Sequence, residues 1–191
     1  VATFSFYPTK NLGAVGEGGA ILTNNKKISN QVYALRAWAP AKKNFFAVGF
    51  NYRMPEIIGA SLLEKIKFLK EDINKRIKIS SIYKKNLLSK NYSNFNQNLK
   101  RHSYHIFAIR VKNRKKFMKE LKKYNIDSTI HYSYVLPKLK IFSNFKQNIK
   151  IFSNALKLSK ELVSLPIYPE LTLKKQLYVI RNVNKLLNSK K

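Results

Sequence analysis

Residues 4–21 read Phe-Ser-Phe-Tyr-Pro-Thr-Lys-Asn-Leu-Gly-Ala-Val-Gly-Glu-Gly-Gly-Ala-Ile, and this stretch is the most informative part of the chain. The apolar run at 3–7, closed by Pro8, predicts a strand, and the run at 20–23, closed by two asparagines, predicts a second one. Four of the six glycines fall between the two strands. Glycine is rare elsewhere, so we expect this cluster to serve a backbone need, either a positive φ or the close approach of a ligand.

Lys10 follows the proline turn, and Ser5 lies five residues earlier, near the end of the first strand. A lysine that is partly desolvated over a concave site loses its proton more easily. The neutral amine can then form an imine with a carbonyl. Spacing alone does not distinguish Lys10 from the other lysines as a reactive residue. A single lysine in so basic a chain is ordinarily a solvated surface residue.

Length and composition set the class of protein. The 191 residues suffice for one domain or two small lobes with a buried core. Lys and Arg number 38 against 9 Asp and Glu, a net charge of +29 that would attract any polyanion. The cations are scattered, Lys, Asn and Ile are in excess, and no nucleic-acid-binding motif is present. We therefore favour a solvated basic surface over nucleic-acid binding. The chain has no cysteine for disulfides or thiolate chemistry, and no apolar stretch long enough to span a membrane.

The first part of the chain continues with predicted helices. Ile28, Val32 and Leu35 predict a helix after the second strand. Residues 40–54 read as a loop. Pro55 suits the first turn of a long amphipathic helix. Its apolar residues recur every three or four positions, at Ile58, Leu62, Ile66, Leu69, Ile73 and Ile77.

Residues 88–101 are polar and predict a linker, after which a second unit begins near His102. Its predicted elements are a strand at 104–111, a helix around Phe117 and Leu121, a strand at 126–132, a helix from 149 to 162, an extended stretch at 165–169 and a last helix capped by Thr172. The order of elements predicts an α/β fold in two pieces.

Two motifs resemble those of the DegT/DnrJ-type nucleotide-sugar aminotransferases, a fold-type-I family that uses pyridoxal phosphate. The family pattern Ser-Phe-x-x-x-Lys, followed by Gly-Glu-Gly-Gly-Ala, stands at Ser5–Lys10 and Gly16–Ala20. Gly49-Phe-Asn-Tyr-Arg-Met-Pro-Glu resembles the segment before the family's long helix. Looser matches, which extend the resemblance to essentially the whole chain, are Tyr104-His-Ile-Phe with Arg110, Ile130-His-Tyr, and Leu165-Pro-Ile-Tyr-Pro-Glu-Leu-Thr.

The resemblance implies a fragment of the fold-type-I fold. Residues 1–54 would be the C-terminal part of the cofactor-binding large domain, including the end of its sheet. Residues 55–87 would be a long connecting helix, and 88–191 a small α+β C-terminal domain. In the family, the turn that holds the cofactor phosphate, the ring stacked on the cofactor and the aspartate at the pyridine nitrogen all precede the lysine. We therefore expect the carboxyl-terminal half of an aminotransferase, incomplete for activity as given.

The resemblance also implies roles for six residues. Lys10 would bind pyridoxal 5′-phosphate covalently and then move a proton, and Ser5 would hydrogen-bond the cofactor phosphate. Asn51 would reach the cofactor phosphate of the neighbouring subunit, which implies a homodimer. Tyr52 and Arg53 would lie near cofactor or sugar phosphates, and His131 would line the substrate cleft.

Simpler readings stay open for three of these residues. Ser5 can be a strand-edge serine, Arg53 a structural residue at the helix entry, and His131 a packed structural histidine. The three histidines form no metal set. Glu17 is expected to order the glycine turn.

The implied function is transamination of a nucleotide-diphosphate-linked keto-deoxysugar, with glutamate as the amino donor. It would take place in the cytoplasm and feed surface polysaccharide of the O-antigen type. Ser133-Tyr-Val-Leu-Pro-Lys departs from the family's Pro-x-Pro-x-His, and Lys138 stands where a substrate-side histidine is expected. The sugar is therefore not specified. Two alternatives remain, a non-catalytic remnant of such an enzyme and a basic nucleic-acid-binding protein.

Overall fold

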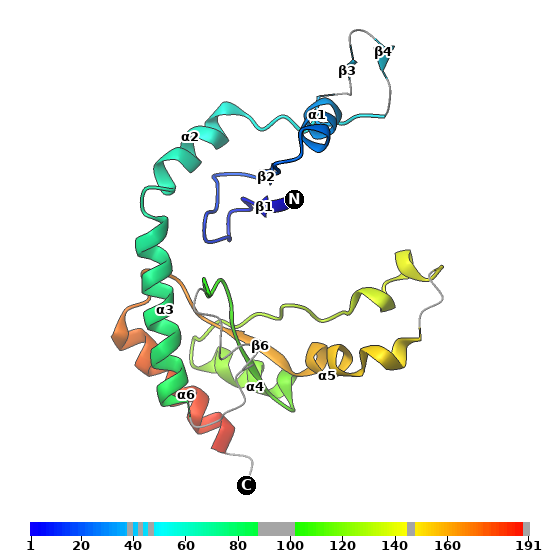
Figure 1. The fold of residues 1–191 in the computed structure, drawn as a ribbon. Coiled ribbons are helices and arrows are strands. Elements are labelled where there is room, and N and C mark those ends of the chain that lie inside the picture. The colour runs from blue at the N-terminus through cyan, green and yellow to red at the C-terminus, as the bar shows by residue number, and fades with distance from the viewer. Residues whose placement is uncertain (38–39, 42–43, 46–47, 88–101, 145–147, 189–191) are drawn as a thin grey trace. The chain divides into compact units, whose positions relative to one another are not determined.

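The computed structural model describes residues 1–37, 40–41, 44–45, 48–87, 102–144 and 148–188, without the side chains of 40–47 (Figure 1). The predicted linker at 88–101 lies outside the described residues. The chain divides into two compact units, Val1–Asp72 and Ile73–Lys191. Within the described ranges, no helix combines the length and apolar character that a membrane crossing requires.

An antiparallel hairpin opens the first unit and confirms both predicted strands. Strand β1 (Ala2–Ser5) pairs with β2 (Gly19–Leu22), in a register that runs from Ala2 opposite Leu22 to Ser5 opposite Gly19. The pairing continues past the strands, because Phe6 N donates to Gly18 O at 2.8 Å. All four residues of β1 are exposed.

Helices complete the first unit. Helix α1 (Lys26–Leu35) begins after Asn25, whose side-chain oxygen accepts hydrogen bonds from the next helical N–H groups, as expected of an N-cap. Short strands β3 (Pro40–Ala41) and β4 (Asn44–Phe45) pair within the predicted loop. Helix α2 (Glu56–Lys65) begins after Pro55. Among the side chains that the structure describes in this unit, Ala14, Ile58 and Leu62 form a buried cluster, with Phe6 and Leu12 packed against it.

Close packing within the chain accounts for the glycine cluster. Across the described residues, no glycine has a positive φ. A Cβ atom at Gly13 would stand 2.2 Å from the carbonyl oxygen of Pro8, and one at Gly18 would stand 3.0 Å from Met54 Sδ. The glycines therefore let the chain approach itself. Of the two expected reasons, the positive φ is wrong, and the close approach of a ligand stays a prediction.

The single helix predicted over 55–87 is wrong, because the structure has two. Helix α2 ends at Lys65 and helix α3 (Leu69–Asn86) begins after a turn at residues 66–68 (Figure 1). In that turn Phe68 N donates to Lys65 O at 3.1 Å, and Leu69 N donates to Ile66 O at 3.3 Å. These bonds span three residues instead of four, which tightens the chain. An apolar repeat of three or four residues continues through such a turn, so the sequence pattern did not reveal it.

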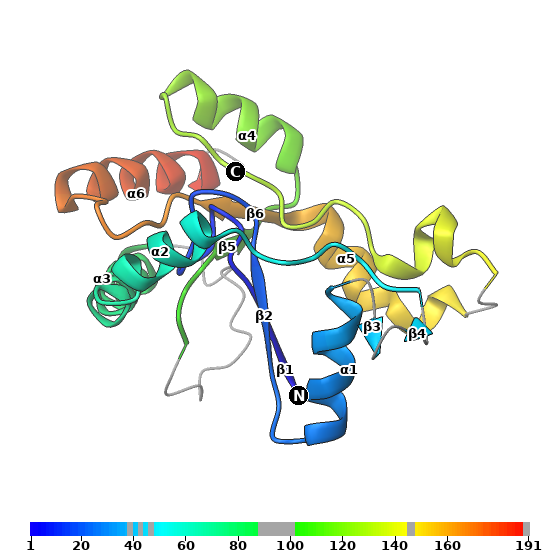
Figure 2. The same cartoon turned by 90° about the horizontal axis from the view of Figure 1, so that it is seen from above.

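The second unit is built on an antiparallel pair of strands. Strand β5 (Phe107–Arg110) pairs with β6 (Leu162–Leu165). Helix α4 (Arg114–Lys123) contacts both β6 and helix α6 (Leu173–Asn188) (Figure 2). Thr172 Oγ1 accepts from Lys175 N at 3.4 Å, in line with the predicted cap of the last helix. The core includes Tyr83, Leu121, Val163 and Val183, all completely buried.

Two predicted elements of this unit need correction. The strand predicted at 126–132 is reduced to one bridge, between Thr129 and Ser164. The helix predicted from 149 to 162 is a 3₁₀ turn (Ile149–Phe152) followed by helix α5 (Ser153–Glu161), and Leu162 already belongs to β6. Two further 3₁₀ turns, Leu136–Lys138 and Lys140–Phe142, precede them.

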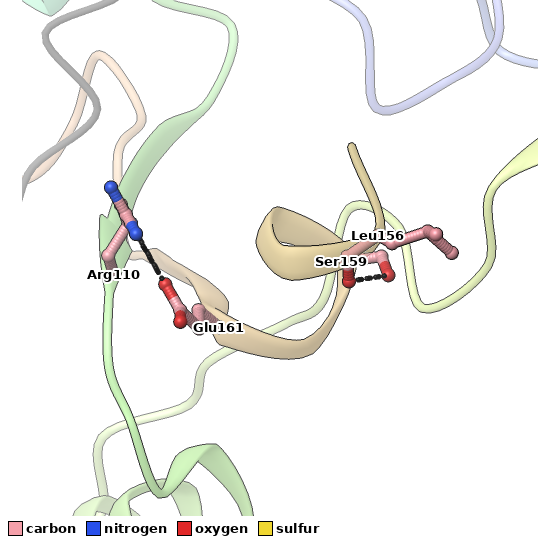
Figure 3. A network of polar contacts seen from close by, with 4 residues as sticks. All are labelled: Arg110, Leu156, Ser159 and Glu161. Atoms are coloured by element: carbon pink, nitrogen blue, oxygen red, sulfur yellow. Dashed lines mark hydrogen bonds and ion pairs between the residues drawn. The ribbon is translucent and has the colours of Figure 1, made fainter. Parts of the chain in front are cut away.

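Polar side chains tie the elements of the second unit together. Arg76 Nη1 donates to Ile167 O at 2.9 Å, and the Tyr83 hydroxyl donates to Pro166 O at 2.8 Å. Burial raises the pKa of Tyr83, and the neighbouring Tyr168 acts in the same direction. Arg110 Nη2 and Glu161 Oε2 form an ion pair at 2.7 Å, which links β5 to the end of α5 (Figure 3).

Candidate functional site

A hollow of about 820 Å³ lies in the first unit beside the hairpin. Its walls come from β1 and β2, from α1 and from the segment that precedes α2. Three of the predicted site residues, Ser5, Tyr52 and Arg53, line it together with Glu17. The structure therefore brings together residues that are nearly fifty positions apart in the sequence.

Ser5 closes β1, directly opposite Gly19. Its hydroxyl oxygen accepts a hydrogen bond from Tyr7 N at 3.3 Å. A hydroxyl that accepts a bond keeps its own hydrogen for a donor bond. Ser5 therefore presents a donor at the wall of the hollow, which is the chemistry that its predicted role requires.

Lys10 lies on the turn that leaves β1. The turn is closed through the main chain, since Lys10 N donates to Tyr7 O at 2.9 Å. Lys65 Nζ donates to Gly13 O at 2.7 Å and so holds the far side of the same loop. Lys10 is partly buried, whereas every other lysine whose burial the structure describes is exposed. Lys10 and Asn51 are not among the residues that line the hollow.

The Asn51–Arg53 segment is held against the end of α1. Asn51 forms an isolated bridge with Ala37, and Tyr52 N donates to Arg36 O at 2.9 Å. The Tyr52 side chain is 71% exposed, and its ring stacks on that of Phe50 with centroids 4.9 Å apart. Main-chain bonds thus set the position of this segment, and the Tyr52 side chain stays exposed.

The sequence analysis did not single out Tyr7, Arg36 and Phe50, which also line the hollow. Arg36 follows the last residue of α1, and its guanidinium lies 4.6 Å from the centroid of the Tyr33 ring. Together with Arg53, it brings two guanidinium groups to one hollow, and planar guanidinium forks suit phosphate oxygens. The signal that could have revealed Arg36 was its place directly after the apolar stripe of the helix.

His131 belongs to the second unit, whereas the hollow is lined by residues of the first. Its Nδ1 atom lies 2.8 Å from Ser164 Oγ. Lys138, the residue found in place of the expected histidine, is exposed. A second hollow of about 1010 Å³ lies along α6, and no predicted site residue lines it. Within the parts of the chain that are described, no three His, Asp or Glu side chains gather to bind a metal ion.

Comparisons with known proteins identify relatives of the chain. The chain is 36% identical over 189 residues to dTDP-3-amino-3,6-dideoxy-α-D-galactopyranose transaminase of Aneurinibacillus thermoaerophilus, covering 96% of this chain and 51% of that protein. It is 31% identical over 188 residues to the pleiotropic regulatory protein of Geobacillus stearothermophilus, covering 95% and 50%. The chain thus spans about half the length of these relatives.

The fold also matches solved structures. DesV of S. venezuelae, in complex with a ketimine intermediate, superposes with a TM-score of 0.88 at 26% identity, covering 97% of this chain and 51% of that chain. This match confirms the predicted α/β fold class and its assignment to a fragment of a sugar aminotransferase fold. The sequence profile of the DegT/DnrJ/EryC1/StrS aminotransferase family matches residues 1–184. Since this match covers nearly the whole chain, the chain belongs to the DegT/DnrJ/EryC1/StrS aminotransferase family.

Proposed function

We propose that this chain is the lysine-bearing half of a pyridoxal-phosphate-dependent aminotransferase that acts on a nucleotide-linked keto sugar. The observation that carries the proposal is the partial burial of Lys10, the lysine of the motif that resembles the family's, in a chain whose other described lysines are exposed. The side-chain amine of Lys10 is the group that an aldehyde would capture as an imine.

The residues present fit a phosphorylated aldehyde cofactor. The Ser5 hydroxyl and the Arg53 guanidinium lie on the walls of one hollow and supply the donors that a phosphate needs. Lys10 lies on the turn that follows Ser5, five residues further along the chain. When bound, pyridoxal phosphate supplies the electron sink through which an amino group passes between an amino acid and a ketone.

Each residue then has a defined task. Lys10 binds the cofactor aldehyde and, once displaced, carries a proton at its Nζ atom. Ser5 and Arg53 hold the phosphate, and Tyr52 contacts the substrate beside them. Asn51 serves the cofactor phosphate of a second subunit, which makes the protein a homodimer. The chain spans about half the length of its relatives, so we propose that catalysis needs the elements of the other half.

The wider context of the reaction follows the family. We propose glutamate as the amino donor, the cytoplasm as the compartment and surface polysaccharide as the destination of the amino sugar. The relative from Aneurinibacillus thermoaerophilus is named as a dTDP-sugar transaminase, and one from Escherichia coli O157:H7 is named GDP-perosamine synthase. These names support a nucleoside diphosphate as the carrier of the sugar. They do not select one ketone.

Borohydride trapping tests the proposal. The chain is incubated with pyridoxal phosphate, reduced with borohydride, digested and analysed by mass spectrometry. Phosphopyridoxyl label should concentrate on Lys10 and vanish in Lys10→Ala. Lys26→Ala is the matched control, because Lys26 is an exposed lysine in the same unit and its removal should leave the Lys10 label unchanged.

Equal labelling of Lys10 and Lys26 would contradict the proposal. That result would mean that the cofactor reacts with any accessible amine. It would favour the alternative of a remnant that keeps the fold without the cofactor chemistry. Binding of nucleic acid with a steep dependence on salt would favour the remaining alternative.

A further inference from the structure

The segment that carries His131 is fixed to strand β6 at Ser164. Ser164 N donates to Thr129 O at 2.8 Å, and Thr129 N donates back to Ser164 O at 3.2 Å. The N–H and C=O groups of Ser164 therefore both form hydrogen bonds with Thr129. The pair of bonds places His131, two residues further along the chain, beside the Ser164 side chain.

The Ser164 hydroxyl is in contact with the His131 ring. Ser164 Oγ lies 2.8 Å from His131 Nδ1, and Ser164 is only 7% exposed. A buried O–H group needs an acceptor, because leaving it without one costs about 1–3 kcal/mol. Among the described residues, His131 Nδ1 is the hydrogen-bond partner that the structure records for this hydroxyl, and the tautomer of the ring decides which of the two donates.

The direction of this hydrogen bond decides the tautomer. If Nδ1 carried the proton of the neutral ring, it would donate to Ser164 Oγ, and the serine hydrogen would have to find another acceptor in a buried place. If the hydroxyl donates, Nδ1 is the acceptor and the ring proton is on Nε2. The second arrangement satisfies both groups at once.

We propose that Ser164 is a positioning residue that holds neutral His131 in the tautomer protonated at Nε2. The ring then offers an N–H donor to an oxygen acceptor, such as the hydroxyl or ketone oxygen of a sugar, and does not offer a base at that atom. The contact with a sugar rests on the proposed function. The tautomer rests only on the contact between Ser164 and His131.

Nitrogen NMR tests the proposal on the 191-residue chain labelled with ¹⁵N-histidine. The chain has three histidines, and the signals lost in His131→Gln identify His131. Spectra are recorded well above pH 6.5, about the ordinary pKa of histidine, so that the ring is neutral. We expect Nδ1 of His131 at the shift of an unprotonated nitrogen and Nε2 at that of a protonated one.

Substitutions at Ser164 separate positioning from packing. In Ser164→Ala we expect the two nitrogen shifts to move toward each other, because the ring then exchanges between tautomers. Ser164→Thr keeps a hydroxyl and should restore the native shifts. Ser159→Ala is the matched control, since Ser159 is also buried in this unit but its hydroxyl donates to Leu156 O at 2.9 Å; it should leave His131 unchanged (Figure 3).

Two results would overturn the inference. One is an Nδ1-protonated ring in the unsubstituted chain, and the other is an unchanged tautomer in folded Ser164→Ala. If Ser164→Ala does not fold, the spectra of the unsubstituted chain and of Ser164→Thr still decide. The readout needs no cofactor, so failure of this inference and failure of Lys10 labelling are separate outcomes.

Discussion

The loop that carries Lys10 folds back on the turn at Pro8. Gly13 makes this close approach possible, because it has no Cβ atom. The motif Ser-Phe-x-x-x-Lys identified Lys10 from the sequence, but its partial burial could not be predicted. The chain returns to the Pro8 carbonyl at Gly13, where a Cβ atom would stand 2.2 Å from Pro8 O. Such contacts across a loop leave no periodic signal in the sequence.

Gly13→Ala should disturb this loop. The added Cβ would stand 2.2 Å from Pro8 O, an overlap that only a shift of the main chain can relieve. We expect a loss of about 1–3 kcal/mol in the stability of the first unit and weaker phosphopyridoxyl labelling of Lys10. Gly59→Ala is the control: its Cβ meets only Met54 Cε at 4.0 Å, and alanine in a helix should add up to about 1 kcal/mol. Equal effects of the two substitutions in denaturant unfolding would contradict this account.

Tyr83 should make the stability of the chain fall in alkali. Its pKa is raised by burial in the folded state, so above pH 10, about the ordinary value, the unfolded state has lost a proton that the folded state keeps. The unfolded state then binds fewer protons, and the free energy of unfolding falls as pH rises. Below pH 10, the contribution of Tyr83 to the free energy of unfolding is fully present. The expected measurement is a steeper alkaline loss of stability in the unsubstituted chain than in Tyr83→Phe.

The phenylalanine variant also has a cost at neutral pH. It loses the hydrogen bond of 2.8 Å to Pro166 O, so we expect it to be less stable there by about 1–2 kcal/mol. Its curve of stability against pH should therefore start lower and decline less above pH 10. Parallel curves would show that another group causes the alkaline transition.

Elements were predicted from apolar spacing, and the errors occurred where that spacing fits two structures. The repeat through Ile66 fits both one long helix and two helices joined by a tight turn. The stripe ending at Leu162 fits a helix, yet Leu162 pairs with Arg110 across the sheet. That pairing depends on a strand more than fifty residues away, which no local pattern reports. Strands next to turn residues, such as β1, were predicted correctly.

Arg76 should be the strongest single link between helix α3 and the segment after β6. It is 8% exposed, and its Nη1 atom donates to Ile167 O at 2.9 Å, with longer bonds to Tyr104 O and His105 O at 3.4 and 3.5 Å. Arg76→Met keeps the stem and removes these donors, so we expect a loss of about 2–4 kcal/mol in denaturant unfolding.

Lys78→Met is the control for this prediction, since Lys78 is an exposed residue of the same helix. Surface substitutions of this kind usually change stability by about 0.5 kcal/mol or less. A loss in Lys78→Met as large as that in Arg76→Met would mean that α3 responds to charge and not to the buried hydrogen bonds.

The whole molecule carries a net charge of +29, and its two units differ in how much core they bury. Among the described side chains, most of the buried apolar ones lie in the second unit, and three lie in the first. The resemblance of motifs predicted the family and the fold class correctly. It could not predict which residues share a hollow, because Ser5, Arg36 and Arg53 come together only through folding.

The charge should make stability depend on salt. Raising ionic strength from about 0.01 M to about 0.1 M shortens the screening length from roughly 30 Å to roughly 10 Å and weakens repulsion among the lysines. We expect a gain of about 1 kcal/mol, which corresponds to roughly 2–4 °C in melting temperature. A variant in which the exposed Lys115 and Lys116 are changed to glutamine should gain less. Melting that is independent of salt would contradict the expectation.

The loop that presents Lys10 closes through peptide groups, since its own N–H bonds the Tyr7 carbonyl. The substitution Lys10→Ala therefore removes the amine and three carbons while the loop keeps its closure. A small alkylamine added to the buffer can then occupy the vacated volume in Lys10→Ala. If the reactivity lost in Lys10→Ala returns as the amine concentration rises, its dependence on the size of the amine would measure the space around the missing group.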